Sequence, residues 1–148
     1  MPHFICPNCK NRSIDSDGRQ GLLRQAVSCE RCGFGFLFEI LDDYYPPPTA
    51  GLVACDRDGR ILAAGRGVFE LTGFQEPELI GRNVVDALGL EGAEGVQNPA
   101  AVALEWGVRR LGEKLQLRTR AGIAKSVTAD FFPAYDEDGG LLVALAPR

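Results

Sequence analysis

The spacing of four cysteines constrains this 148-residue chain more than any other feature. Cys6 and Cys9 form one C-x2-C pair, Cys29 and Cys32 form a second, and nineteen residues separate the two pairs. Two residues between cysteines allow both thiolates to turn toward one metal ion, and two such turns complete a tetrahedral site. Four thiolates leave no position for a water molecule, so we predict a structural site rather than a catalytic one. The prediction is one zinc ion per chain.

The residues around these cysteines resemble a zinc ribbon over about residues 1–43. Residues 21–29 and 34–41 have the composition and alternation of two strands, which would form the hairpin that brings the cysteine pairs together. A unit this short has little core of its own and is expected to fold only with its metal. Two alternatives stay open. They are a pair of disulfides, which a cytosolic protein disfavours, and iron in a rubredoxin-like site, which usually has a longer gap between its cysteine pairs.

A proline-rich joint at residues 44–48 separates the first unit from residues 49–148. Three consecutive prolines favour polyproline II, which makes a semi-rigid spacer. We therefore expect the joint to hold the two units apart more than it lets them move freely. The apolar run FGFLF at residues 34–38 must nevertheless be buried against something. The second unit is the nearest candidate, and the sequence leaves open whether the cover comes from this chain or from another.

The second unit is predicted to be an antiparallel α+β domain. Two short apolar strands at 51–56 and 61–65 flank an Asp58-Gly59 hairpin turn. The order of these elements predicts a five-stranded antiparallel sheet with the helices on one face. The remaining elements expected, in chain order, are short helices at 68–73, 76–81 and 83–90, a longer helix from 98 to 112, and strands at 113–119, 124–135 and 140–147.

Several short motifs make residues 49–148 resemble a PAS domain. They are the aspartate-glycine turn between the first two strands, the sequences LTGF (residues 71–74) and ELIGR (residues 78–82), and the closing FFPAYDEDGGLLVAL (residues 131–145). One departure is clear, because many PAS domains have an asparagine near the end of the second strand, where this chain has AAGRG. The resemblance implies a sensory or signalling module.

The resemblance also identifies which PAS cofactors lack their ligands here. Gly81, Arg82 and Asn83 match the motif of flavin-binding light sensors, but Val84 stands where those proteins have the reactive cysteine, so no flavin photoadduct is expected. Haem-sensing PAS domains usually bind iron through a histidine on the long helix, and the only histidine is His3 in the first unit. The cysteine that attaches the chromophore of photoactive-yellow-type domains has no counterpart after residues 83–88.

Two further sets of residues are candidates for binding. An apolar interior could hold a small ligand, although plain hydrophobic core is the favoured interpretation; its candidate lining residues are Val53, Phe69, Phe74, Val85, Leu88, Leu115 and Phe131. On the expected long helix, Ala101, Leu104, Val108 and Leu111 form the core-facing stripe. Val102, Trp106 and Arg109 lie off that stripe and predict a partner or dimer surface, unless the ribbon or a loop covers the tryptophan.

Composition and missing motifs narrow the function. A formal net charge of −4 argues against phosphate-neutralising nucleic-acid binding, and no apolar run is long enough to span a membrane. No secretory signal is visible, so the cytoplasm is expected, and no catalytic constellation accompanies His3. Because the chain ends at its last expected strand, no covalent effector is expected. We predict a non-catalytic regulatory adaptor that binds a partner protein and forms a homodimer. The alternatives are a ligand- or redox-responsive sensor and a ribbon-based nucleic-acid-binding transcription accessory.

Overall fold

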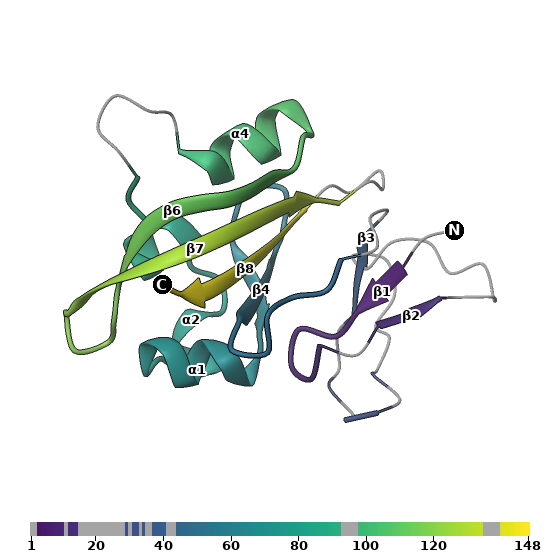
Figure 1. The fold of residues 1–148 in the computed structure, drawn as a ribbon, viewed down its shortest axis with the longest axis horizontal. Coiled ribbons are helices and arrows are strands. Elements are labelled where there is room, and N and C mark those ends of the chain that lie inside the picture. Colours follow the sequence, from purple (N-terminus) through teal and green to yellow (C-terminus); the bar gives the residue numbers. More distant parts are fainter. Residues whose placement is uncertain are drawn as a thin grey trace.

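A five-stranded antiparallel sheet forms the centre of the computed structural model (Figure 1). The model describes residues 3–10, 12–14, 29, 31–32, 34, 37–40, 44–92, 98–134 and 140–148. The strand order is β5-β4-β8-β7-β6. The last strand in the chain, β8, therefore pairs with β4, which comes first in the chain among these five strands. The strands are β4 (Gly51–Cys55), β5 (Ile61–Ala64), β6 (Arg110–Arg118), β7 (Ala124–Pro133) and β8 (Leu141–Pro147). The five-stranded antiparallel architecture predicted from the sequence is confirmed.

Four short helices cover one face of this sheet: α1 (Arg66–Thr72), α2 (Glu76–Leu79), α3 (Val84–Leu88) and α4 (Pro99–Trp106). Local sequence determines where they begin and end. The side chains of Asn83 and Asn98 accept backbone N–H groups at the starts of α3 and α4. Gly73 and Gly107 end α1 and α4 in the left-handed conformation, with φ angles of 82° and 65°.

The predicted long helix is wrong in its second half. Helix α4 ends at Trp106 because Gly107 adopts a left-handed backbone, and β6 then begins at Arg110. The predicted core stripe is also wrong. Ala101 is exposed on the helix itself, and Val108 and Leu111, which are 47% and 51% exposed, lie beyond its end. The residues that α4 buries are Pro99, Ala100 and Ala103.

The N-terminal unit contains a second, three-stranded sheet of order β2-β1-β3. Its strands are β1 (His3–Ile5), β2 (Arg12–Ile14) and β3 (Phe38–Ile40), and both pairings are antiparallel. Strand β3 falls within the strand predicted at residues 34–41. The other predicted strand, at 21–29, lies outside the described residues except for Cys29, and β1 and β2 were not predicted.

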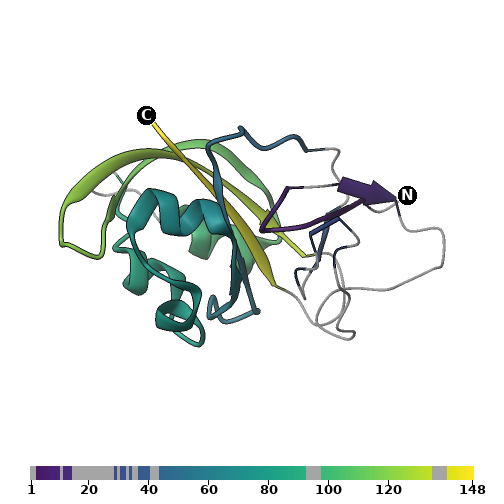
Figure 2. The ribbon, with the colours of Figure 1, turned by 90° about the horizontal axis from the view of Figure 1, so that it is seen from below.

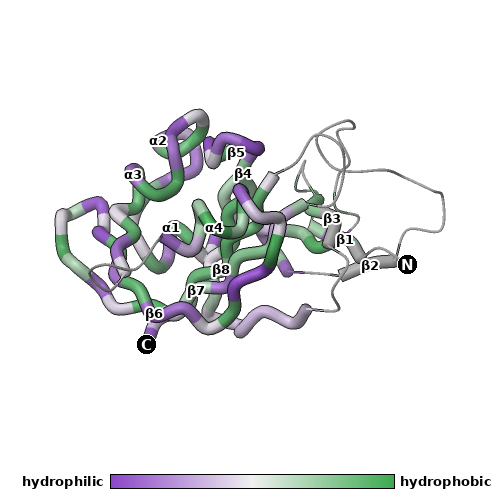
Figure 3. The backbone as a smooth tube through the Cα atoms, turned by 90° about the horizontal axis from the view of Figure 1, so that it is seen from above, coloured by the Kyte–Doolittle hydropathy of each residue, from purple (hydrophilic) through white to green (hydrophobic). Residues whose placement is uncertain are grey.

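The N-terminal unit packs on the face of the five-stranded sheet that the helices leave open. Figure 2 shows the helices and the purple N-terminal strands on opposite sides of the yellow strand β8. Figure 3 shows the hydrophobic (green) strands β4 and β8 between them. One apolar cluster joins the two units: Phe4, Ile5, Cys6, Cys29, Leu37 and Phe38 from the first, and Leu52, Ala54, Ala63, Phe132, Leu142 and Ala144 from the second. The cover for the aromatic run therefore comes from the same chain.

The joint between the units is fastened to the sheet. The hydroxyl of Tyr44 donates to the carboxylate of Asp130 on β7, and its ring centroid lies 4.5 Å from that of Phe132. Burial, together with the Asp130 carboxylate, raises the pKa of Tyr44. Farther along, the amine of Lys10 donates to the carbonyl of Pro48 at 3.0 Å. The prolines of the joint predicted that it would hold the two units apart, and this prediction is wrong, because the two units are in contact.

The two units approach each other closely at Gly65, the residue before α1. A Cβ atom on Gly65 would stand 1.9 Å from the carbonyl oxygen of Pro7, so only glycine fits. The next residue, Arg66, donates its backbone N–H to the side-chain oxygen of Asn8 at 3.0 Å. The turn between Cys6 and Cys9 is thereby seated directly on the start of α1.

Replacing Gly65 with alanine should weaken the docking of the two units while leaving each sheet folded. Its φ of −78° suits any residue, so the effect is steric. Such a clash costs about 1–3 kcal/mol, or roughly a 5- to 150-fold shift in the docking equilibrium. Hydrogen exchange at the Arg66 amide measures that shift directly, because this amide donates to Asn8.

Gly81→Ala is the control, since it has a φ of 84° but no neighbour within 4 Å. It should lower global stability by about 1 kcal/mol without selective exposure of Arg66. Equal exchange at Arg66 in the two variants would contradict this account.

Candidate metal centre

The four cysteines of the N-terminal unit converge on one point. Their sulfur atoms all lie within 4.8 Å of one another, and the Cys6–Cys32 and Cys9–Cys29 sulfur pairs are each 3.6 Å apart. A disulfide bond is about 2.05 Å long, so these separations are longer than those of bridged cysteines. Zinc–sulfur bonds of about 2.3 Å in a tetrahedron place sulfurs about 3.8 Å apart. The observed separations fit such a site.

The first cysteine pair is shaped by a tight turn after β1. The backbone N–H of Lys10 donates to the Cys6 carbonyl at 2.9 Å, and Lys10 itself has a left-handed φ of 63°. This turn directs the backbone N–H of Cys9 at the Cys6 sulfur, at 3.5 Å. An amide that donates to a sulfur stabilises the thiolate, which is the form that binds a metal.

The second pair is closed by a backbone hydrogen bond from the Cys29 N–H to the Phe34 carbonyl at 2.7 Å. Cys29 is buried, whereas Cys32 is exposed at the surface. The side-chain nitrogen of Asn8 donates to the Cys32 sulfur at 3.7 Å. Asn8 therefore contacts both a candidate ligand and, through its oxygen, the start of α1.

The thiols differ in how readily they ionise. Burial raises the pKa of Cys6. At Cys32 desolvation is outweighed by hydrogen bonds from the Phe34 backbone N–H, the Asn8 side chain and the neighbouring thiols, which lower its pKa to about 6. Cys32 therefore ionises more readily than Cys6, and a cation at the centre would favour ionisation of the buried thiols too.

The donor set fits a metal of soft character. Four sulfurs with amide donors suit zinc or iron and leave no open coordination position. Cys6, Cys9, Cys29 and Cys32 would hold the ion, which would supply folding energy to a unit whose described strands have three residues each.

The predicted interior residues fall into two groups. Val53, Leu88, Leu115 and Phe131 are at most 2% exposed and lie in the core cluster between the sheet and the helices, and Phe74 and Val85 pack against it. Phe69 does not belong there, because it is 48% exposed. Helix α1 turns Val68 and Leu71 toward the sheet, so the two residues between them, Phe69 and Glu70, point outward. Whether the interior takes a ligand stays a prediction.

The stretch that resembles a flavin site has a structural role here. Asn83 caps α3 by accepting the backbone N–H groups of Val85 and Asp86, at 3.0 and 3.3 Å. Val84 is 1% exposed and begins the helix, so its apolar side chain belongs to the core. Cys55 lies on β4 in the same cluster, and burial raises the pKa of its thiol.

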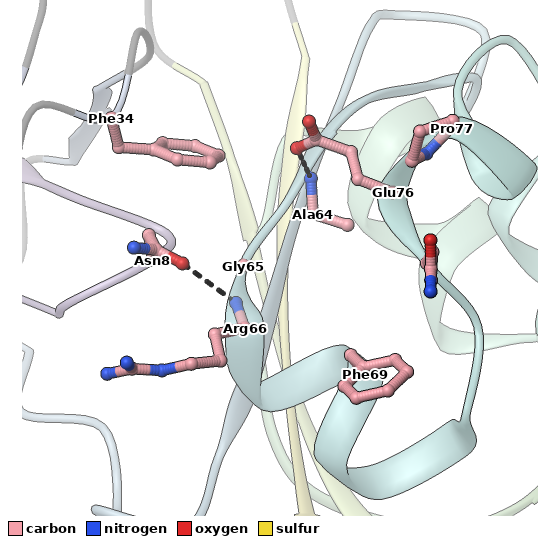
Figure 4. Close-up of a pocket in the computed structure, with 9 residues that line it drawn as sticks. Asn8, Phe34, Ala64, Gly65, Arg66, Phe69, Glu76 and Pro77 are labelled. Carbon is pink, nitrogen blue, oxygen red and sulfur yellow. Dashed lines mark hydrogen bonds between the residues drawn. The ribbon is translucent and has the colours of Figure 1, made fainter.

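Phe69 instead lines a pocket of about 390 Å³ at the junction of the two units, which sequence reasoning missed. Figure 4 shows Phe34 and Asn8 approaching it from the N-terminal unit, opposite Phe69 and Glu76. A larger polar groove beside it is lined by Cys9, Cys32, Lys10 and Arg31, among others, and so reaches two of the candidate metal ligands. No periodicity marks these residues, because they meet only when the units dock.

The predicted partner surface lies on and after α4. Trp106 is 68% exposed, Arg109 is exposed and Val102 is half-buried. Val108 and Leu111 extend the exposed apolar surface beyond the helix. The role of this surface stays a prediction.

Comparison with known proteins identifies the fold of the second unit. No family model and no curated protein sequence matches the chain. Among solved structures, a PAS domain from Colwellia psychrerythraea is 20% identical, with a TM-score of 0.52, covering 65% of this chain and 84% of that one. A domain of a sensor histidine kinase/response regulator from Geobacter sulfurreducens is also 20% identical, with a TM-score of 0.52, covering 69% and 86%. The second unit has the PAS fold.

A light sensor shares the same architecture. The light-state dimer of the fungal blue-light photoreceptor Vivid is 15% identical, with a TM-score of 0.57, covering 72% of this chain and 82% of that one. The PAS resemblance read from the LTGF and ELIGR motifs is therefore confirmed at the level of fold. None of the helices in the described part of the chain is long and apolar enough to cross a membrane.

Metal stoichiometry should depend on the four clustered cysteines and not on Cys55. Native mass spectrometry of protein purified without chelators or added metal should find one zinc per chain. Cys32→Ala, which removes the most exposed ligand, should lose it or bind it at least about tenfold more weakly. Cys55→Ala is the matched control, since that thiol lies in the PAS core and should leave zinc binding unchanged. Visible absorbance from iron, or zinc loss in the Cys55 variant, would refute the zinc assignment.

Proposed function

We propose that this protein is a non-catalytic regulatory adaptor in which a PAS domain and a structural zinc ribbon together mediate protein–protein interaction. The observation that carries the proposal is the docking of the four-cysteine unit on the open face of the PAS sheet. A closed four-thiolate site offers no position for substrate, so its use is to shape and hold a surface.

The sheet supplies a physical route for a signal. Alternate residues of β4 contact opposite sides, with Val53 in the helix-side core and Leu52 against the N-terminal unit. On β8, Val143 and Leu142 divide in the same way. Because packed cores transmit strain, a change among the interior residues would reach the docked ribbon. A small ligand in the PAS interior would be one such input.

The surface that binds the partner is proposed to include Val102, Trp106 and Arg109. Tryptophan and arginine are enriched among residues that carry binding energy at interfaces. Trp106 is 68% exposed, and exposed apolar neighbours follow it at Val108 and Leu111. Self-association through this surface would make the protein a homodimer.

A second candidate function is a redox- or metal-responsive sensor. It is favoured by the exposure of Cys32 and by the groove that leads to Cys9 and Cys32. In that case loss of the ion would release the Cys6–Cys9 turn from α1, and the output would again be the docking state of the ribbon.

Trp106→Ala should weaken self-association without destabilising the fold. A buried tryptophan at an interface contributes about 2 kcal/mol or more, so the dimer dissociation constant should rise by at least about tenfold. The free energy of unfolding should change by less than about 0.5 kcal/mol, because the side chain is exposed in the single chain. Sedimentation velocity and urea denaturation measure the two quantities.

Ile123→Ala provides the control for this experiment. Ile123 is 63% exposed and lies in the turn between β6 and β7, away from α4. It should leave self-association unchanged. Equal effects of the two variants, or a monomeric wild-type protein, would remove the dimer from the proposal, and the tryptophan would then have to be tested against a captured partner.

A further inference from the structure

The pocket at the junction of the two units is a composite site. Phe34 is contributed by the cysteine-bearing loop, Phe69 by α1, and Gln75, Glu76 and Pro77 by the start of α2. Figure 4 shows the rings of Phe34 and Phe69 on two sides of the space, with the Glu76 carboxylate at its rim. Its volume of about 390 Å³ lies within the usual range for ligand sites. The pocket exists only while the N-terminal unit is docked.

The negative charge of the pocket has no cationic partner among the residues that the structure describes. One oxygen of Glu76 accepts the backbone N–H of Ala64 at 2.9 Å. Arg66 also lines the pocket, but its guanidinium is paired with Glu70 at 3.7 Å and extends away from Phe69 in Figure 4. The carboxylate of Glu76 therefore remains available to an incoming cation.

The walls suit a cation that carries an apolar stem. The faces of aromatic rings are electron-rich and attract a cation within about 6 Å of the ring. Phe34 and Phe69 offer such faces together with apolar surface, and Glu76 adds a formal charge. The whole protein is acidic, with a net charge of −4, which favours encounter with a basic partner.

We propose that this pocket binds an arginine side chain of a partner protein, with the stem of the arginine between Phe34 and Phe69 and its guanidinium at Glu76. The inference rests on the proposed adaptor function and names the chemistry of its partner. Arginine is preferred to lysine because its planar, weakly hydrated guanidinium stacks on aromatic rings and donates in a fork to a carboxylate.

The test uses the zinc-loaded full chain and small probes of matched shape. N-acetyl-arginine-N-methylamide and its citrulline counterpart, which is uncharged, are titrated at constant ionic strength. The amide resonance of Ala64 is the reporter, since this group donates to Glu76. Arginine should give saturable shifts, with an affinity at least about fivefold higher than that of citrulline.

Variants assign the binding to the pocket. Glu76→Gln keeps an acceptor for the Ala64 N–H and should abolish the preference for arginine over citrulline. Phe69→Ala should weaken both probes. Glu105→Gln is the matched control, because it removes an equal charge from an exposed site on α4 and should leave the preference intact. The same spectra report whether each variant is folded.

Three outcomes would overturn the inference. They are no difference between arginine and citrulline, a preference that survives Glu76→Gln, or free guanidinium ion binding as tightly as the arginine probe, which would mean that the stem makes no contact. None of them bears on self-association through Trp106, so failure here leaves the adaptor proposal standing. If the protein does not self-associate but still binds the arginine probe, the adaptor function fails and the pocket is instead that of a sensor of small cations.

Discussion

The structure depends on burial of the central PAS strands from both sides. Every residue of β4 and the first five residues of β8 are buried, although strands in an open antiparallel sheet usually expose one face. The helices cover one face, and the N-terminal unit covers the other. Burial of each leucine or phenylalanine side chain contributes about 1.5–3 kcal/mol of free energy. Exposing Leu52, Phe132 and Leu142 to water would therefore strongly disfavour undocking. The small unit in turn gains from the PAS sheet the core that it lacks.

Uninterrupted apolar runs in the sequence indicate this burial on both faces. GLVAC at 51–55 and LLVAL at 141–145 do not alternate with polar residues, which is the pattern of strands buried on both faces. Other features can also be recognised from short stretches of sequence, because each is a local signal. They are the cysteine spacing, the turn at Gly59 and the helix caps at Asn83 and Asn98. From these the sheet, three of the helices and the arrangement of the four thiols could be predicted.

What escaped prediction depends on contacts between residues distant in the chain. The spacing of Leu104, Val108 and Leu111 imitated a helix, but a left-handed Gly107 ended it, and glycine alone did not reveal which conformation it would take. Phe69 was assigned to the interior because apolar residues usually lie there, and its true position follows from the packing of α1. The junction pocket left no trace in the sequence, since Phe34 and Glu76 meet only through docking.

Asn8 connects the candidate metal centre directly to the PAS domain. Its nitrogen donates to the Cys32 sulfur, and its oxygen accepts the backbone N–H of Arg66 at the start of α1. One rigid amide cannot rotate to follow a displaced sulfur without releasing the helix. Phe34 is tied to the same centre, because its carbonyl accepts the Cys29 N–H. Disturbing the thiolates would therefore move one wall of the junction pocket and loosen the contact at Gly65 together. The arrangement of the four thiols, the docking of the two units and the shape of the pocket are therefore coupled through these contacts.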